Sequence, residues 1–384
     1  MPNPVMVIPG IMGSGLENLY ALPPGSTWSV AGGVEQTLFG PDFERLALLD
    51  SGEADEDESV VNRASQLLPI AYGSLVAALR GRLNLPVYVF PYDWRYSITK
   101  AADALVRRVY RLQKKELASL PSWDGTFDFV CHSMGGLVLR AFIAQWPKAG
   151  GGAKLPVGRI VFIATPHLGS LDAVEAMIRG ETVIFGGRKE IRKLARTFPG
   201  VYDLLPRFDG AVLDEKGNKL SIFDKDIWQD NVTTPDENDY PIVANHLTGA
   251  QNDLQGLANI IGDLAARTLV VYGRFGNSTL TSVTVLADHN GIPNWFDFDN
   301  ADKHKGDGDD VVPVTSALLA GVPAVEMDES DMGYFNFKAR LLSVHAALPS
   351  LDEVQTVTYR FLGGDTGTDL LPTGMDNSRY KPPA

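Results

Sequence analysis

The stretch VCHSMGG at residues 130–136 places a serine between small residues, where an apolar run gives way to a helical pattern. Such a strand-turn-helix site raises a serine hydroxyl above a sheet, because small residues two before and two after it let the backbone turn sharply. Gly135 is the second small residue, and Cys131 stands where glycine is usual. The cysteine side chain is small enough for the turn to close. The sequence therefore predicts a nucleophile at Ser133.

A serine hydroxyl becomes reactive when a histidine takes its proton and a carboxylate orients that histidine. In sites built on this turn, the acid and then the histidine follow the serine along the chain. The acidic stretch GDGDDVVP at residues 306–313 and then His345 occur in that order. Ser350 and Glu353 form a capping-box pattern for a following helix, which places His345 on a loop. The sequence thus predicts a Ser-His-Asp triad.

The acidic stretch offers Asp307, Asp309 and Asp310 as the acid. The spelling Gly-x-x-Asp-x-x-Val-Pro, common in hydrolases at this point, fits residues 306–313 without a gap if the acid is Asp309. The interval to His345 also suits one strand, at residues 323–328, and a loop. We therefore expect Asp309 to orient His345, while Asp307 and Asp310 face solvent or bond to loop backbone as turn residues do.

The other histidines are weaker candidates for the base. His132 adjoins the serine but points off the turn in another direction, so we expect a structural role. His167 follows an apolar strand near the expected site. Because it precedes the acid along the chain, it is a stronger candidate for a pocket residue than for the base. The remaining histidines lie in irregular segments and are expected at the surface: His246, His289 and His304.

Backbone N–H donors must stabilise the oxyanion of a tetrahedral intermediate. Met134 directly follows the serine, so its N–H is the first expected donor. The glycine-rich stretch IPGIMGSGLE at residues 8–17 follows the first apolar strand. Within this stretch, Ile11 is the expected second donor.

Continuous apolar runs predict the strands that must hold these residues. Such runs, rather than alternating ones, are typical of strands buried on both faces of a parallel sheet. Helical periodicity lies between them, at residues 97–117 and at residues 134–146, where Pro147 is expected to end the helix. This alternation predicts an α/β fold. The runs occupy residues 5–10, 87–94, 127–133, 159–166 and 268–273.

The uneven spacing of these elements locates insertions. Residues 1–170 and 266–363 are expected to form one α/β core, with residues 17–67 as an inserted loop or lid. Residues 171–265 form a second long excursion, which we expect to cap one edge of the sheet. Residues 364–384 are rich in Gly, Asp and Pro and are expected to be a loose tail.

Composition excludes several classes of function. The 384 residues are 45% hydrophobic and 21% charged, which is ordinary for a soluble globular protein. The net charge of −13 argues against general binding to nucleic acid or anionic membrane, since both need basic surface. The acidic run at residues 52–58 is expected to be a solvated loop without chemistry.

Cysteine and histidine spacing bears on cofactors and location. The single cysteine cannot form an intrachain disulfide, and no zinc-type spacing occurs among the six histidines, so no metal or other cofactor is expected. The chain shows neither a signal-peptide pattern nor an apolar run long enough for a membrane span. A cytoplasmic location is therefore expected.

Several stretches, in order along the chain, resemble the lecithin:cholesterol acyltransferase family of α/β-hydrolases, which includes lysosomal phospholipase A2 and phospholipid:diacylglycerol acyltransferases. The resemblance implies a mostly parallel central sheet flanked by helices, with cap or lid insertions. The stretches are VIPGIMGSGLE (residues 7–17), FPYDWR (90–95), HSMGG (132–136), ATPHLGS (164–170), FPGVYDLLP (198–206) and GDGDDVVP (306–313).

By this resemblance, Ser133 accepts the acyl group, His345 is the base, an aspartate of residues 306–310 is the acid, and Ile11 and Met134 donate to the oxyanion. Family members carry acyl groups of glycerolipid esters through a covalent acyl-enzyme, which water or an alcohol acceptor then resolves. The resemblance implies a lipid ester as the substrate, and a phospholipid is the first candidate. It also implies transient apolar contact between the protein and a lipid surface.

Three residues in or beside the matching stretches are candidate substrate contacts: Gly10, Trp94 and His167. Animal members of the family rely on disulfides and secretion, which this chain lacks, so their lipid preference is not transferred. Hydrolysis and transfer differ only in the acceptor and both stay open, as does the oligomeric state. The alternatives are a carboxylesterase or triacylglycerol lipase of small esters, and a lipid-binding protein without activity.

Overall fold

A computed structural model describes residues 3–18, 25–28, 46–48, 62–118, 123–180, 189–235, 239–257, 259–288, 290–300, 304–331 and 343–383. The acidic run at residues 52–58 and His289 lie outside these ranges. Across the ranges that are described, no helix has the length and apolar character needed to cross a membrane.

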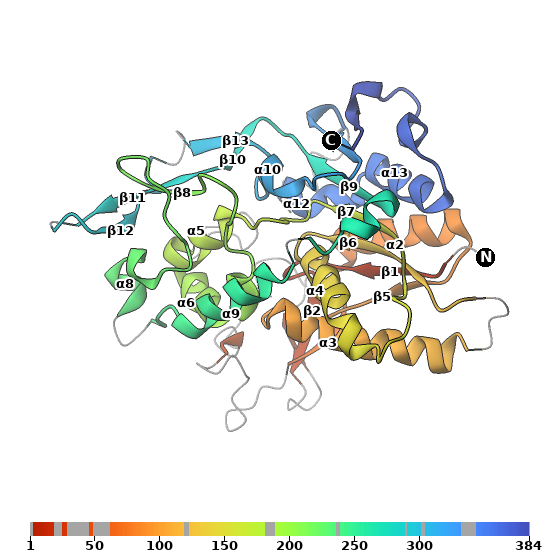
Figure 1. The fold of residues 1–384 in the computed structure, drawn as a ribbon, viewed down its shortest axis with the longest axis horizontal. Helices are drawn as coiled ribbons and strands as arrows, with labels where there is room; N and C mark the ends of the chain where they lie inside the picture. Colours follow the sequence, from red (N-terminus) through yellow and green to blue (C-terminus); the bar gives the residue numbers. More distant parts are fainter. Residues whose placement is uncertain are drawn as a thin grey trace.

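A seven-stranded sheet forms the centre of the molecule (Figure 1). Its strand order is β15-β14-β9-β7-β6-β1-β5, and every neighbouring pair is parallel except β14 and β15. The predicted α/β fold with a mostly parallel sheet is confirmed. The strands are β1 (Val5–Ile8), β5 (Val87–Val89), β6 (Phe127–His132), β7 (Val157–Ile163), β9 (Thr268–Gly273), β14 (Ala324–Met327) and β15 (Tyr380–Lys381).

Helices cover both faces of this sheet (Figure 1). Side chains alternate along β1, so that Val5 and Val7 enter one hydrophobic core while Met6 and Ile8 enter the other. Burial on both faces explains why the strands read as continuous apolar runs. The first core is covered by α2 (Pro69–Leu83) and α13 (Asp352–Gly363), and the second by α3 (Ile98–Arg111) and α4 (Met134–Ala149).

The ends of the predicted helices differ from expectation. The helix predicted at residues 97–117 is α3, followed by a short π-helical segment (Leu112–Glu116). Pro147 does not end α4, which continues to Ala149. A proline removes one N–H donor, and here the following turn is closed by the Gly150 N–H, which donates to the Trp146 carbonyl at 2.6 Å.

The predicted capping box after His345 is wrong. α13 begins at Asp352 with Leu351 as its N-cap, and Ser350 Oγ instead donates to the Ala347 carbonyl at 3.0 Å. His345 lies in a one-turn helix, α12 (Val344–Ala347), rather than on a loop. Ser343 caps this turn by accepting the Ala346 N–H.

The two insertions form small sheets and helices beside the core (Figure 1). Within the first, β2 (Ser14–Asn18) pairs with β3 (Gly25–Trp28) and β4 (Asn62–Leu67). The second contains α5 (Leu171–Arg179), α6 (Lys189–Thr197), α7 (Pro199–Tyr202), β8 (Val212–Asp214), α8 (Asp230–Thr233) and α9 (Ala244–Gln255).

The second insertion also recruits a later part of the chain. β11 (Val283–Ala287) pairs in parallel with β8 and antiparallel with β12 (Pro293–Phe296). β10 (Asn277–Leu280) and β13 (Lys305–Asp307) form a separate two-stranded sheet. We therefore propose that the cap comprises residues 171–265 together with residues 277–307, which the sequence assigned to the core.

The expectation of a loose C-terminal tail is wrong. β15 adds to the central sheet, with Val325 opposite Tyr380 and Ala324 opposite Lys381. Arg379 beside it bonds to Asp331 at 3.0 Å. Without β15, β14 would be an edge strand with unpaired backbone groups, and pairing satisfies them. Composition alone does not reveal such a pairing.

Candidate active site

Ser133 stands at the sharp turn between β6 and α4. Its φ of 52° and ψ of −130° lie outside the usual range for a residue with a side chain. A Cβ on Gly135 would lie 2.5 Å from the Pro9 carbonyl oxygen, and one on Gly136 would lie 2.2 Å from Thr165 Oγ1. Both positions need glycine because the helix packs directly on neighbouring strands. The predicted strand-turn-helix geometry is confirmed.

The structure brings together the three residues expected to form a triad. His345 Nε2 lies 2.8 Å from Ser133 Oγ, and His345 Nδ1 lies 2.8 Å from Asp309 Oδ2. The three residues are 2%, 3% and 1% exposed, respectively. With the proton on Nδ1, the imidazole donates to Asp309 and accepts the serine proton at Nε2, which is the order of a Ser-His-Asp triad. Their catalytic roles stay a prediction.

The loop after β13 separates the three aspartates. Asp309 Oδ1 accepts the N–H groups of Val311 and Val312 at 3.2 and 2.7 Å, which fixes the carboxylate beneath His345. Asp307 forms an exposed ion pair with Arg274. Asp310 adopts a φ of 74° and donates its N–H to Thr279 Oγ1 at 2.9 Å. Only Asp309 of the three bonds to His345.

The two expected oxyanion donors are the N–H groups of Met134 and Ile11. Met134 is the first residue of α4, so its N–H has no acceptor within the helix. The Gly10 N–H donates to Tyr72 Oη at 2.9 Å, whereas no hydrogen bond between described residues uses the Ile11 N–H. A Cβ on Gly10 would lie 2.7 Å from Ser133 Cβ. The glycine-rich turn therefore lies against the serine, and its tight approach requires glycine.

A second set of buried bonds links this turn to the histidine. Tyr72 Oη donates to His132 Nδ1 at 2.7 Å, and His132 Nε2 donates to the His345 carbonyl at 3.0 Å. This direction follows because a carbonyl only accepts, which leaves Nδ1 as the acceptor. Burial, with His345 nearby, holds the pKa of His132 well below its usual range, so the ring is neutral.

The expected structural position of His132 is confirmed, but sequence reasoning missed Tyr72. Tyr72 lies on α2, whose apolar face covers the sheet, and it belongs to no motif. The only available signal was a hydroxyl on a face that should be buried, because such a group needs a polar partner.

Trp94 and His167 occupy buried packing positions. Trp94 Nε1 donates to the Ser14 carbonyl at 3.1 Å, and its ring packs edge-on against Phe198. His167 packs beside Arg140, whose Nη1 lies 3.2 Å from His167 Nδ1. Burial and this neighbouring guanidinium lower the pKa of His167 well below its usual range. Gly10, the third candidate substrate contact, packs directly on Ser133.

The histidines expected at the surface are half-buried where they are described. His304 Nδ1 lies 2.8 Å from Ser282 Oγ, and the ring of His246 packs edge-on against Tyr202. Among the residues with assigned positions, no group of three or more His, Cys, Asp and Glu is placed to hold a metal ion.

The sheet, the strained serine turn and the buried Ser-His-Asp arrangement define an α/β-hydrolase fold. A family model described as lecithin:cholesterol acyltransferase matches residues 80–257. The resemblance to this family that the motifs indicated is confirmed over these residues, which are slightly less than half of the chain. The match includes the stretches at residues 90–95, 132–136, 164–170 and 198–206, whereas Asp309 and His345 lie beyond it.

Solved structures similar to this chain include one chain of the Tle4-Tli4 complex, with a TM-score of 0.56, 16% identity and coverage of 95% of this chain and 99% of that one. A second is the mature Bacillus licheniformis lipase BlEst2, with a TM-score of 0.39, 11% identity and coverage of 85% and 83%. A third is the Legionella pneumophila phospholipase PlaB, with a TM-score of 0.32, 14% identity and coverage of 66% and 43%. No curated protein sequence matches the chain.

Proposed function

We propose that the protein is a serine-dependent lipid acyl hydrolase or acyltransferase that acts on glycerolipid esters, with phospholipids as the first candidate substrates. The observation that carries this proposal is the chain of hydrogen bonds from Ser133 through His345 to Asp309. The match to a family named for acyl transfer from lecithin supports the lipid substrate.

Acylation begins when Ser133 Oγ attacks the ester carbonyl carbon and His345 Nε2 takes the serine proton. Asp309 stabilises the resulting imidazolium through Nδ1–H. The N–H groups of Ile11 and Met134 donate to the oxyanion of the tetrahedral intermediate. His345 then protonates the departing alcohol, and the acyl group remains on Ser133.

Deacylation reverses these proton transfers with a second nucleophile. Water or an alcohol enters, loses its proton to His345 Nε2 and attacks the acyl carbonyl carbon. The bond from Ser133 Oγ to the acyl carbon then breaks, and Ser133 Oγ takes the proton back from His345. Water releases a fatty acid, whereas an alcohol gives a new ester. Mass spectrometry of products from a mixed lipid panel, with and without long-chain alcohols or sterols, tests the proposal: free fatty acid alone indicates hydrolysis, and new esters indicate transfer. Turnover of small soluble esters but of no lipid favours the carboxylesterase alternative.

The cap supplies a surface for contact with aggregated lipid. Ile292 and Trp295 are 53% and 51% exposed at the β11–β12 hairpin, where apolar side chains gain free energy by entering a lipid interface. We expect the double variant Ile292→Ser, Trp295→Ser to lower turnover of long-chain lipid vesicles by about tenfold, because roughly 1.4 kcal/mol of docking free energy is lost.

Turnover of a short soluble ester should change less than about twofold, because that substrate needs no docking. The matched control is Asn290→Ser in the same hairpin, which removes no apolar surface. Equal losses on vesicles and on the soluble ester would contradict a docking role for this hairpin.

Tyr72 is expected to position both the glycine-rich turn and His345. In Tyr72→Phe, the Gly10 N–H loses its acceptor and His132 Nδ1 loses its donor, which loosens both sides of the site. We expect kcat on a soluble ester to fall by about 10- to 100-fold, because small displacements of reacting groups carry penalties of that size. The measurement is steady-state kinetics of the purified variant.

Tyr272→Phe is the matched control, because Tyr272 is also a buried residue whose hydroxyl donates a hydrogen bond, to Glu326 at 2.6 Å. Its kcat should stay within about twofold of the wild-type value, since its hydroxyl bonds to Glu326 and not to a residue of the triad. A similar loss in both variants would indicate a general effect of losing a tyrosine hydroxyl and would contradict the positioning role.

A further inference from the structure

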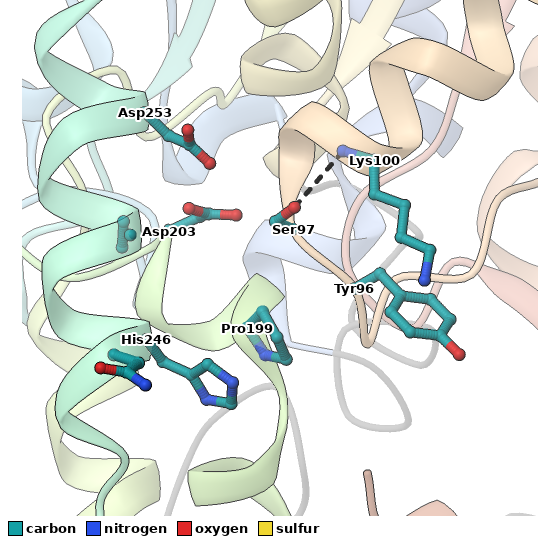
Figure 2. Close-up of a pocket in the computed structure, with 10 residues that line it drawn as sticks. Tyr96, Ser97, Lys100, Pro199, Asp203, His246 and Asp253 are labelled. Carbon is teal, nitrogen blue, oxygen red and sulfur yellow. Dashed lines mark hydrogen bonds between the residues drawn. The ribbon is translucent and has the colours of Figure 1, made fainter. Parts of the chain in front are cut away.

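A pocket of about 250 Å³ lies between the start of α3, the short helix α7 and α9 of the cap (Figure 2). It is separate from the candidate active site. A Cβ on Gly200 in α7 would lie 2.9 Å from Met134 Cε and 2.8 Å from the Tyr96 carbonyl oxygen. The α7 backbone therefore fills the space between this pocket and Met134. The pocket lining includes Tyr96, Ser97, Pro199, Asp203, His246 and Asp253.

Asp203 brings a buried carboxylate oxygen without a partner to this pocket. The residue is 1% exposed, and its Oδ2 accepts the Ile98 N–H at 2.7 Å at the start of α3. Among the described residues, Oδ1 has no hydrogen-bond partner. Capping of α3 thus accounts for the burial of Oδ2, but it does not account for the burial of Oδ1. A buried acceptor without a donor is costly, which points to a ligand that supplies one.

Asp253 adds a second acid to the same end of the pocket. Its Oδ2 accepts the Thr99 hydroxyl at 3.0 Å, and Figure 2 shows its carboxyl group on the same side as that of Asp203, close to Ser97. Burial raises the pKa of Asp203 well above its usual range and raises that of Asp253, and the charge of Asp253 raises the pKa of Asp203 further.

The cations near these acids bond to other groups, although the charge of Arg207 partly offsets the rise in the pKa of Asp203. Lys100 extends away from the two carboxyl groups, and its Nζ lies 3.6 Å from the centroid of the Tyr96 ring (Figure 2). Arg207 donates to the carbonyls of Leu254 and His167. Within the described part of the chain, no ion pair includes Asp203 or Asp253.

We propose that this pocket binds a primary ammonium group, carried by a small aliphatic amine or by an aminoalkyl head group. An ammonium has three N–H donors, and the two carboxylates with the Ser97 hydroxyl provide acceptors for them. Pro199 and Ala250 give the pocket apolar wall for a short alkyl chain. A calcium ion fits less well, because it takes six to eight oxygen ligands and the site offers two carboxylates.

Proton linkage follows from this chemistry. An ammonium stabilises the ionised form of Asp203 and Asp253, so binding releases protons wherever the free acids are protonated. Affinity should therefore rise with pH until the amine itself loses its proton. The other charged or titratable groups around Asp203 are Tyr96 and Lys100 at the start of α3, His246 from α9 and Arg207 after α7.

Isothermal titration with n-propylamine tests the proposal, with n-propanol as the uncharged control. We expect a Kd of about millimolar for n-propylamine, proton release that varies the heat between buffers, and no detectable heat from n-propanol. Asp203→Asn and Asp253→Asn should each weaken binding by at least about tenfold. Asp209→Asn is the matched control, because this exposed acid pairs with Lys219 outside the pocket.

Gly249→Leu tests the pocket without touching either acid. A Cβ at Gly249 meets no atom within 4 Å, so a larger side chain can enter the pocket and should abolish binding while the helix stays folded. Unchanged affinity in this variant, or equal affinity for n-propylamine and n-propanol in the wild-type protein, would overturn the proposal.

A competition experiment distinguishes a lipid head group from a free amine as the source of the ammonium. It uses the Ser133→Ala protein so that no lipid is consumed. Displacement of n-propylamine by phosphatidylethanolamine vesicles, but not by phosphatidylcholine vesicles, would assign the site to a lipid head group. Displacement by neither would assign it to free amines. Because the readout is binding, failure here would leave the proposed ester chemistry untouched.

Discussion

Ser133→Ala is expected to lower ester turnover by about 10^3- to 10^6-fold while the protein stays folded. Ser133 Oγ supplies the attacking electron pair, and its bond to His345 Nε2 is the first link in the proposed proton transfer. Alanine keeps the Cβ that packs against Gly10 and removes only the oxygen, so the free energy of unfolding should change little. The measurements are the rate on a soluble ester and the thermal unfolding midpoint.

A fluorophosphonate probe separates this role from a general effect on the site. The wild-type protein should be labelled at Ser133, and Ser133→Ala should not be labelled. Ser14→Ala is the matched control, since Ser14 is also fully buried and accepts a backbone N–H, that of Tyr92 at 3.1 Å. It should keep its label. Retained turnover in Ser133→Ala would refute the proposed serine chemistry, whereas a wild-type protein with neither labelling nor turnover would favour the lipid-binding alternative.

The second large effect is expected at the acid. Asp309→Asn should lower turnover by about 10^2- to 10^4-fold. The asparagine oxygen would keep the N–H groups of Val311 and Val312, so its NH2 group would face His345 Nδ1. The imidazole would then carry its proton on Nε2 and could not accept the serine proton. Steady-state kinetics of the folded variant measures this loss.

The neighbouring aspartates provide controls in the same loop. Asp307→Asn removes an exposed ion pair with Arg274, and such pairs contribute roughly 0 to 1 kcal/mol. Asp310→Asn retains a residue type that tolerates positive φ. Each should cost less than about tenfold in turnover. If either variant were more damaging than Asp309→Asn, the assignment of the acid would be wrong, although the serine chemistry would survive.

Local patterns predicted the core of the fold well. The run at residues 268–273 coincides with β9, and the strands around Ser133 also lie where their apolar runs predicted. The errors lie where a contact distant in sequence decides the structure. β15 pairs with β14, and β11 pairs with β8. Neither pairing leaves a local signature, because period and composition report only which faces are buried.

The residues of the candidate site also differ in whether local sequence patterns could predict them. Ser133, Asp309 and His345 were predictable because the triad has a fixed order along the chain and the serine turn has a characteristic sequence motif. Tyr72 was not, because its role depends on the distance from α2 to the serine turn. Asp203 lies in a stretch that matched the family, yet the unpartnered oxygen emerged only once its neighbours were known.

The long sequence separation between Ser133 and His345 has a consequence during synthesis of the protein on the ribosome. Their hydrogen bond spans 212 residues, and contacts of such separation form late because a long loop must first be closed. A ribosome-bound chain that has exposed the serine turn but not residues 343–347 carries a nucleophile without its base. The order of translation would therefore delay the proposed ester chemistry until nearly all of the sheet has emerged.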